Sequence, residues 1–116
     1  MKITTVDERE YAELLHIWEC CYLDINPRAN NKDVFEQKNR LGNSAIGNLD
    51  LRCVRSITNK IIGFIGIYHD SIEIFCVLPS HRLIGVGGAL LRYAIDEALV
   101  KHITHHRFRI MNECFY

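Results

Sequence analysis

One arginine and three glycines stand close together in the segment "HRLIGVGGALL", which begins at His81. Arg82 precedes Gly85 by three residues, and Gly87 and Gly88 open a segment with helical spacing. The N-terminus of a helix carries unpaired N–H groups and a partial positive charge, and glycine lets a ligand approach these amides closely. The segment therefore predicts an anion site, favouring a diphosphate, with Arg82 as a charged donor. The alternative is a glycine-rich turn with a solvated arginine.

A strand and a helix must position this loop. The apolar run of residues 76–78 stops at Pro79, which cannot donate to a further ladder bond. After the glycines, apolar residues recur at helical spacing, which predicts an amphipathic helix. Its expected buried positions are Leu90, Leu91, Ala94, Ile95, Ala98 and Leu99.

The remaining sequence predicts one α+β domain over residues 1–116. A short strand opens the chain, and Asp7 with Glu10 forms a capping-box pattern before a helix that ends at Asn26–Pro27. A second, short helix is expected near residues 32–40. Three strands follow within residues 50–79, and their connections are too short for crossover helices, which indicates an antiparallel meander. A final strand is expected at residues 106–111.

This order, β-α-(α)-β-β-β-α-β, predicts a mixed, mainly antiparallel central sheet. The middle strand of the meander, "IIGFIGIYHD", is apolar at nearly every position. A strand of this kind is buried on both faces, so we expect helices to flank the sheet on each side.

Composition narrows the class of protein. Fourteen Lys and Arg balance fourteen Asp and Glu, so no nucleic-acid partner is indicated. No segment is long and apolar enough to span a membrane, and the N-terminus has no hydrophobic signal core. Five cysteines, an odd number without paired spacing, favour reduced thiols. We therefore expect a cytoplasmic protein.

Several motifs around the loop resemble one family. "RLIGVG", residues 82–87, fits the pattern Q/R-x-x-G-x-G/A of the GNAT superfamily of N-acetyltransferases. The strand end Val77-Leu78-Pro79, the preceding "NKIIGFIGIY" and the following "ALL..A" are also similar to this superfamily. The resemblance covers about residues 50–101.

The resemblance implies an acetyl-CoA site, with acetyl-CoA as cosubstrate. Its pantetheine arm is expected to hydrogen-bond to the strand backbone at Cys76 and Val77. Its diphosphate is expected at Arg82 and the backbone amides of Leu83, Ile84, Gly85, Val86, Gly87 and Gly88.

The resemblance also implies acetyl transfer by direct attack of an amine, from a small molecule or a peptide. Such a reaction needs a base for the amine and an acid for the leaving thiolate. Glu73 is the candidate base, because it lies on the strand beside the expected thioester; the alternative is an outward-facing carboxylate. Tyr116 is the candidate acid, against the alternative of a frayed terminus.

The chain departs from the family pattern at its end. Family members usually continue with a helix and further strands, whereas this sequence stops at "MNECFY". We expect an exposed sheet edge, which could support a homodimer. A non-catalytic CoA-binding or interaction module therefore remains the alternative function. His102, His105 and His106 are interpreted as exposed residues, with no metal site expected.

Overall fold

A computed structural model describes residues 1–42, 46–98 and, for the backbone alone, 102–103. Its secondary structure has the predicted order through the third helix, and a short strand at 102–103 that the sequence did not predict follows it. The strands are β1 (Ile3–Thr5), β2 (Asp50–Arg55), β3 (Ile61–Tyr68), β4 (Ser71–Val77) and β5 (His102–Ile103); the helices are α1 (Tyr11–Ile25), α2 (Asn31–Arg40) and α3 (Val86–Asp96). Short 3₁₀ turns lie at η1 (Glu8–Glu10), η3 (Ile46–Asn48) and η4 (Pro79–His81).

The described strands form one sheet in the order β1-β2-β3-β4-β5. The first three pairings are antiparallel, and β5 pairs with β4 in parallel, at Ser71–His102 and Ile72–Ile103. The prediction of an α+β fold with a mixed, mainly antiparallel sheet is therefore confirmed. The strand expected at residues 106–111 lies outside the described residues.

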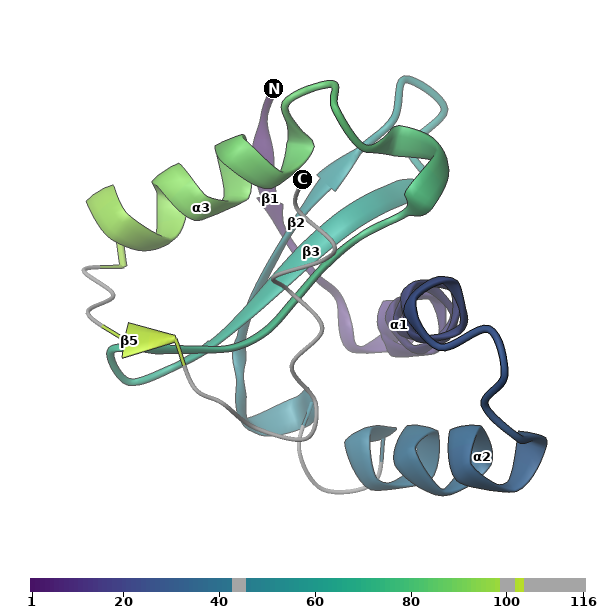
Figure 1. Cartoon of the computed structure of the whole chain (residues 1–116). Helices are drawn as coiled ribbons and strands as arrows, with labels where there is room; N and C mark the ends of the chain where they lie inside the picture. Colours follow the sequence, from purple (N-terminus) through teal and green to yellow (C-terminus); the bar gives the residue numbers. More distant parts are fainter. Residues whose placement is uncertain (43–45, 99–101, 104–116) are drawn as a thin grey trace.

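Two hydrophobic clusters lie on opposite faces of this sheet. One contains Trp18 of α1, Val34 of α2 and Phe64 of β3; the other contains Ile65 of β3 and Leu90 of α3. The neighbours Phe64 and Ile65 point to opposite faces, as successive strand residues must. Consequently α3 covers one face and α1 with α2 the other, as Figure 1 shows. The prediction that helices flank both faces is confirmed.

The N-terminal helix begins one turn later than the capping pattern predicts. Asp7 and Glu10 form the capping box, with the Asp7 N–H donating to Oε1 of Glu10 over 3.0 Å, but this box opens the η1 turn. Helix α1 follows directly from Tyr11 and ends before Asn26, whose N–H donates to the Tyr22 carbonyl. Pro27 follows, and it disfavours a helical conformation for the residue before it.

The predicted apolar stripe of the third helix is wrong at its C-terminal end. Val86, Leu90 and Ala94 are buried, whereas Ile95 is 53% exposed. Leu91 and Ala98 pack against the same cluster as predicted, and so does Tyr93, so the side of α3 that meets the sheet is displaced away from Ile95. The helix ends at Asp96, so Ala98 lies beyond it, and Leu99 lies outside the described residues.

An ion pair ties the start of the chain to the end of β2. Arg55 donates from Nη1 to Oε2 of Glu10 over 2.6 Å and from Nη2 to Oε1 over 2.8 Å. Both side chains are largely shielded, at 17% and 25% exposure. The Arg55 hydrogen bonds lower the pKa of Glu10 from its ordinary value of 4.5 to about 2. This carboxylate therefore stabilises the folded state most strongly above pH 4.5.

We expect Glu10→Gln to lower the free energy of unfolding by about 1–2 kcal/mol at pH 7. The difference from wild type should shrink as the pH falls from 5 to 2, because the unfolded carboxyl takes up its proton first and the folded one last. Urea unfolding of both proteins across this pH range measures it. A difference that is constant with pH would contradict this account of the ion pair.

Candidate cofactor site

The loop between β4 and α3 has an unusual backbone. Leu83 has φ +68° and Gly85 has φ +93°, both in the left-handed region. Turns of this kind aim successive N–H groups into one concave surface that suits an anion. Gly85 is also the N-cap of α3 and has no side chain with which to cap the first turn. The predicted loop residues thus meet at the positive end of a helix.

Space around the loop suits the close approach of a ligand. An added Cβ at Gly88 would meet nothing within 4 Å, so this first-turn backbone is open. The side chains of Leu83 and Ile84 are also exposed, at 87% and 56%. Gly87, in contrast, is buried. The structure therefore brings the predicted residues 83–88 together with Gly88 on the open side.

Arg82 is held in place rather than solvated. Its Nη1 donates to Oδ2 of Asp24 over 2.7 Å, and its Nε donates to the carbonyl oxygen of Val77 over 3.4 Å. Its side chain is only 16% exposed, against 46% for Asp24. Asp24 lies near the C-terminal end of α1, so this pair joins α1 to the loop. Sequence reasoning did not find Asp24, which lies 58 residues away in the chain.

Strand register decides which backbone groups of β4 face away from β3. Leu78 donates its N–H to the Ile62 carbonyl, so Leu78 and Ile62 form a hydrogen-bonded pair. The adjacent pair, Gly63 and Val77, is therefore not hydrogen-bonded across the two strands. Antiparallel alternation then turns the backbone of Val77 outward, with that of Phe75, while Cys76 faces β3. The outward carbonyl of Val77 also accepts from Sγ of Cys21 over 3.1 Å.

Glu73 is the extra residue of a β-bulge. Gly66 pairs with Ile74 and Ile67 pairs with Ile72, which leaves Glu73 between them without a partner on β3. The bulge also sends Ile72 and Ile74 to opposite faces of the sheet, although they are two residues apart. Bulges often re-aim a side chain beside a functional site. Here the Glu73 carboxylate is partly exposed and accepts from the Ser71 hydroxyl over 3.0 Å.

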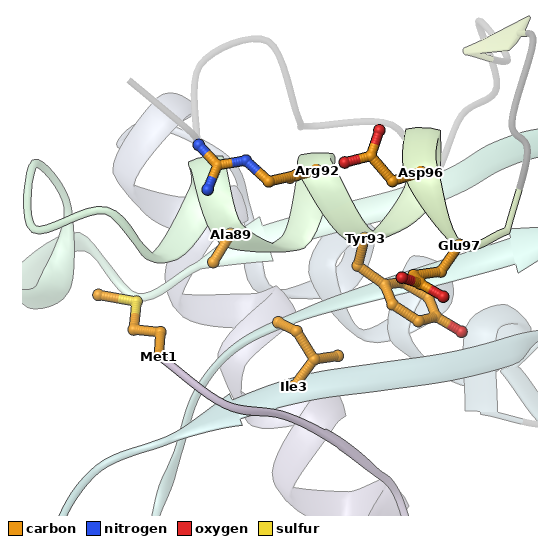
Figure 2. A pocket seen from close by; sticks show the side chains of 7 residues that line it. All are labelled: Met1, Ile3, Ala89, Arg92, Tyr93, Asp96 and Glu97. Atoms are coloured by element: carbon orange, nitrogen blue, oxygen red, sulfur yellow. The ribbon is translucent and has the colours of Figure 1, made fainter.

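Two cavities lie outside the residues predicted from the sequence. One, of about 360 Å³, lies between β1 and α3 (Figure 2) and is lined by Met1, Ile3, Ala89, Arg92, Tyr93, Asp96 and Glu97. Another, of about 380 Å³, lies between α1, the β2–β3 turn and η4, and includes His81 beside Arg82. Neither contains Glu73 or any residue of the glycine loop.

Some predicted features cannot be placed. Tyr116 and the side chains of His102, His105 and His106 lie outside the described residues. Within the part of the chain that is described, no three His, Cys, Asp or Glu side chains gather as metal ligands, and no helix is long and apolar enough to cross a membrane. The acid role of Tyr116 and the absence of a metal stay predictions.

Taken together, these features define a class: an α+β protein in which a glycine-rich loop with left-handed turns joins the bulged strand β4 to the N-terminus of α3. A sequence profile of the Acetyltransferase (GNAT) family matches residues 11–110. The chain therefore belongs to this family, whose chemistry is acetyl transfer from an acyl-CoA.

Solved structures share the fold at low sequence identity. Apo-form YjaB from Escherichia coli superposes with a TM-score of 0.72 at 20% identity, covering 87% of this chain and 69% of that one. PaiA N-acetyltransferase from Thermoplasma acidophilum, in complex with coenzyme A, gives 0.63 at 14% identity over 80% and 68%. Ribosomal-protein-alanine N-acetyltransferase from Brucella melitensis gives 0.57 at 16% identity over 90% and 78%. A comparison with curated protein sequences gives no match.

Proposed function

We propose that this chain transfers the acetyl group of acetyl-CoA to a primary amine by direct attack. The observation that carries this proposal is the layout of β4. Glu73 stands at the bulge, and the glycine loop follows the opposite end of the same strand. Val77 lies four positions after Glu73 on this strand, a span of about 13 Å. Such a span suits a long ligand with a diphosphate at one end and a reactive group at the other.

The loop fits the diphosphate of this cosubstrate. The amides of residues 83–88 would hold it, helped by the positive end of α3, and Arg82 would add a charged donor. Open space at Gly88 and the left-handed turns at Leu83 and Gly85 support this assignment.

The outward edge of β4 would hold the pantetheine arm. Sequence reasoning assigned Cys76 and Val77 to this contact. Register supports Val77, with Phe75 as its outward neighbour, because the Cys76 amide and carbonyl face Phe64. We propose that Val77 provides the backbone contact, whereas the Cys76 amide and carbonyl face β3 and its side chain is fully buried.

The side chains of the protein have two proton transfers to perform in this reaction. When bound, acetyl-CoA supplies a thioester whose carbonyl carbon is open to attack by an amine nitrogen. Glu73 takes the proton that the nitrogen loses as the new C–N bond forms. Tyr116 is the proposed donor of the proton that the leaving CoA sulfur would take as the C–S bond breaks.

The acceptor class and the setting belong to the same proposal. An amine on a small molecule or a peptide is the proposed acceptor, with neither nucleic acid nor membrane as a partner. We propose that residues 1–116 act as one domain, and as a homodimer if the sheet edge is exposed. The proposed setting is cytoplasmic, as expected for five cysteines without paired spacing.

Calorimetric titration with acetyl-CoA, with light scattering on the same sample, tests the proposal. We expect saturable binding at micromolar concentrations. Supplying amines of different classes should then release free CoA thiol, detected with a thiol reagent. Binding without thiol release from any amine would favour the non-catalytic CoA-binding module. No binding by the folded protein would remove the acetyltransferase proposal.

A further inference from the structure

The Arg82 side chain already forms an ion pair with the carboxylate of Asp24. A guanidinium can grip a phosphate with two donors along either of two edges, Nε–Nη2 or Nη1–Nη2. In this chain Nε donates to the Val77 carbonyl and Nη1 donates to Asp24. Each edge therefore has at least one donor in use within the protein. A two-donor grip on a diphosphate requires Arg82 to give up at least one of these contacts.

The two contacts do not have equal strength. The bond to Asp24 spans 2.7 Å between opposite charges, whereas the bond to the Val77 carbonyl spans 3.4 Å to a neutral oxygen. A short hydrogen bond between two opposite charges is stronger than a long one from a charged donor to a neutral carbonyl. Asp24 is therefore the main competitor for the guanidinium.

Helix α1 holds this competitor in a fixed place. Cys21, three residues before Asp24 and one turn away on the same helix, is fully buried and donates from Sγ to the Val77 carbonyl. The outward end of β4 is thus tied to α1 both by Cys21 directly and by Asp24 through Arg82. Because α1 is packed against β4, Asp24 stays within reach of Arg82.

We infer that Asp24 is a positioning residue that sets cofactor affinity, by competing with the diphosphate of CoA for Arg82. This inference rests on the proposed function and deepens it. Without ligand the Asp24–Arg82 pair keeps the guanidinium folded against α1 and β4. Ligand binding exchanges one anionic partner of Arg82, the Asp24 carboxylate, for another, the diphosphate. Because the Asp24–Arg82 ion pair of the ligand-free protein must open first, it lowers the net affinity for CoA.

The test compares Asp24→Asn with wild type by calorimetric titration with CoA. We expect the substitution to tighten binding about three- to fivefold, because a partly exposed ion pair of ordinary strength no longer has to open. Glu19→Gln is the matched control. It removes one negative charge from the same helix, from a carboxylate paired with Lys38 at 3.6 Å, and should leave affinity within about twofold.

A double-mutant cycle separates competition for Arg82 from a structural effect. In an Arg82→Ala background, Asp24→Asn should no longer change the CoA affinity. Weaker binding by Asp24→Asn would show that Asp24 orients Arg82 toward the ligand, and would overturn the inference. An equal gain with and without Arg82 would also overturn it, because the effect would then be general charge repulsion.

The outcomes also separate this inference from the proposed function. If no variant binds CoA, both fail. If wild type binds and Asp24→Asn binds no tighter, only the inference fails. If wild type does not bind CoA, the proposed function fails, whatever Asp24→Asn does.

Discussion

Gly88→Asp should weaken CoA binding at least about 30-fold. A carboxylate at this position would stand in the first turn of α3, where the diphosphate is proposed to bind, and two like charges a few ångströms apart repel by several kcal/mol at an effective dielectric constant of about 20. The fold should tolerate the change, because an added Cβ meets nothing within 4 Å and an acidic residue in a first helical turn is favourable. Calorimetric titration measures the affinity, and thermal unfolding checks the fold.

Gly88→Asn is the matched control, because it has the same size without the charge. It should retain most of the affinity that Gly88→Asp loses. Gly88→Ala should in addition raise stability by up to about 1 kcal/mol, as alanine is the better helix former. Gly87 would be a poorer test position, because it is buried and its replacement would also disturb packing. A folded Gly88→Asp protein with unchanged CoA affinity would falsify the assignment of the loop.

Glu73→Gln should lower kcat about 100-fold and leave the affinity for acetyl-CoA within about twofold. The amide keeps the size of the side chain but cannot accept the proton that the amine must lose, and a positioned base contributes about 10²- to 10⁴-fold. Steady-state release of CoA thiol gives kcat, and titration gives the affinity.

Ser71→Ala is the control for this prediction. It leaves the Glu73 carboxylate in place and removes only the hydroxyl that donates to it over 3.0 Å. We expect a loss of less than about fivefold, from poorer orientation of the carboxylate. A Glu73→Gln protein that is as fast as wild type would mean that Glu73 is an outward-facing carboxylate on a strand, with no role in proton transfer.

The elements of the fold follow from local patterns in the sequence. The continuous apolar run of β3 predicts burial on both faces, and residues 61–67 are all buried. Short connections predict an antiparallel meander, and β2, β3 and β4 pair in that way. These features depend on neighbouring residues alone, so one sequence is enough to predict them.

Features of the site that depend on register could not be predicted in the same way. Whether Phe75 or Cys76 turns its backbone outward depends on which β3 residue each one faces. A one-residue bulge at Glu73 changes this relation, and "SIEIFCV" gives no separate signal for it. The sequence could name the strand and the candidate base but could not show how either is oriented.

The pairing of Arg82 with Asp24 could not be predicted from the sequence for a different reason. The loop motif shows why an arginine is useful there, but Asp24 lies 58 residues earlier, on a helix whose rotation over the sheet is fixed by packing. A single sequence holds no information on such a pairing. The error at Ile95 of α3 has a related cause, since helical spacing shows which residues share a side but not which side meets the sheet.

The light packing of α2 has a consequence for how such a protein can change over generations. Of its ten residues only Val34 is buried, whereas Phe35 is 63% exposed. Most substitutions in α2 should therefore cost little stability, and natural selection can act on its surface almost independently of the fold. Substitutions in β4, α3 and the loop between them should be tolerated less often. The glycines, the bulge and the buried residues of this region contribute both to the packing of the core and to the proposed CoA site. Drift and adaptation should accumulate in α2 while the loop stays nearly constant.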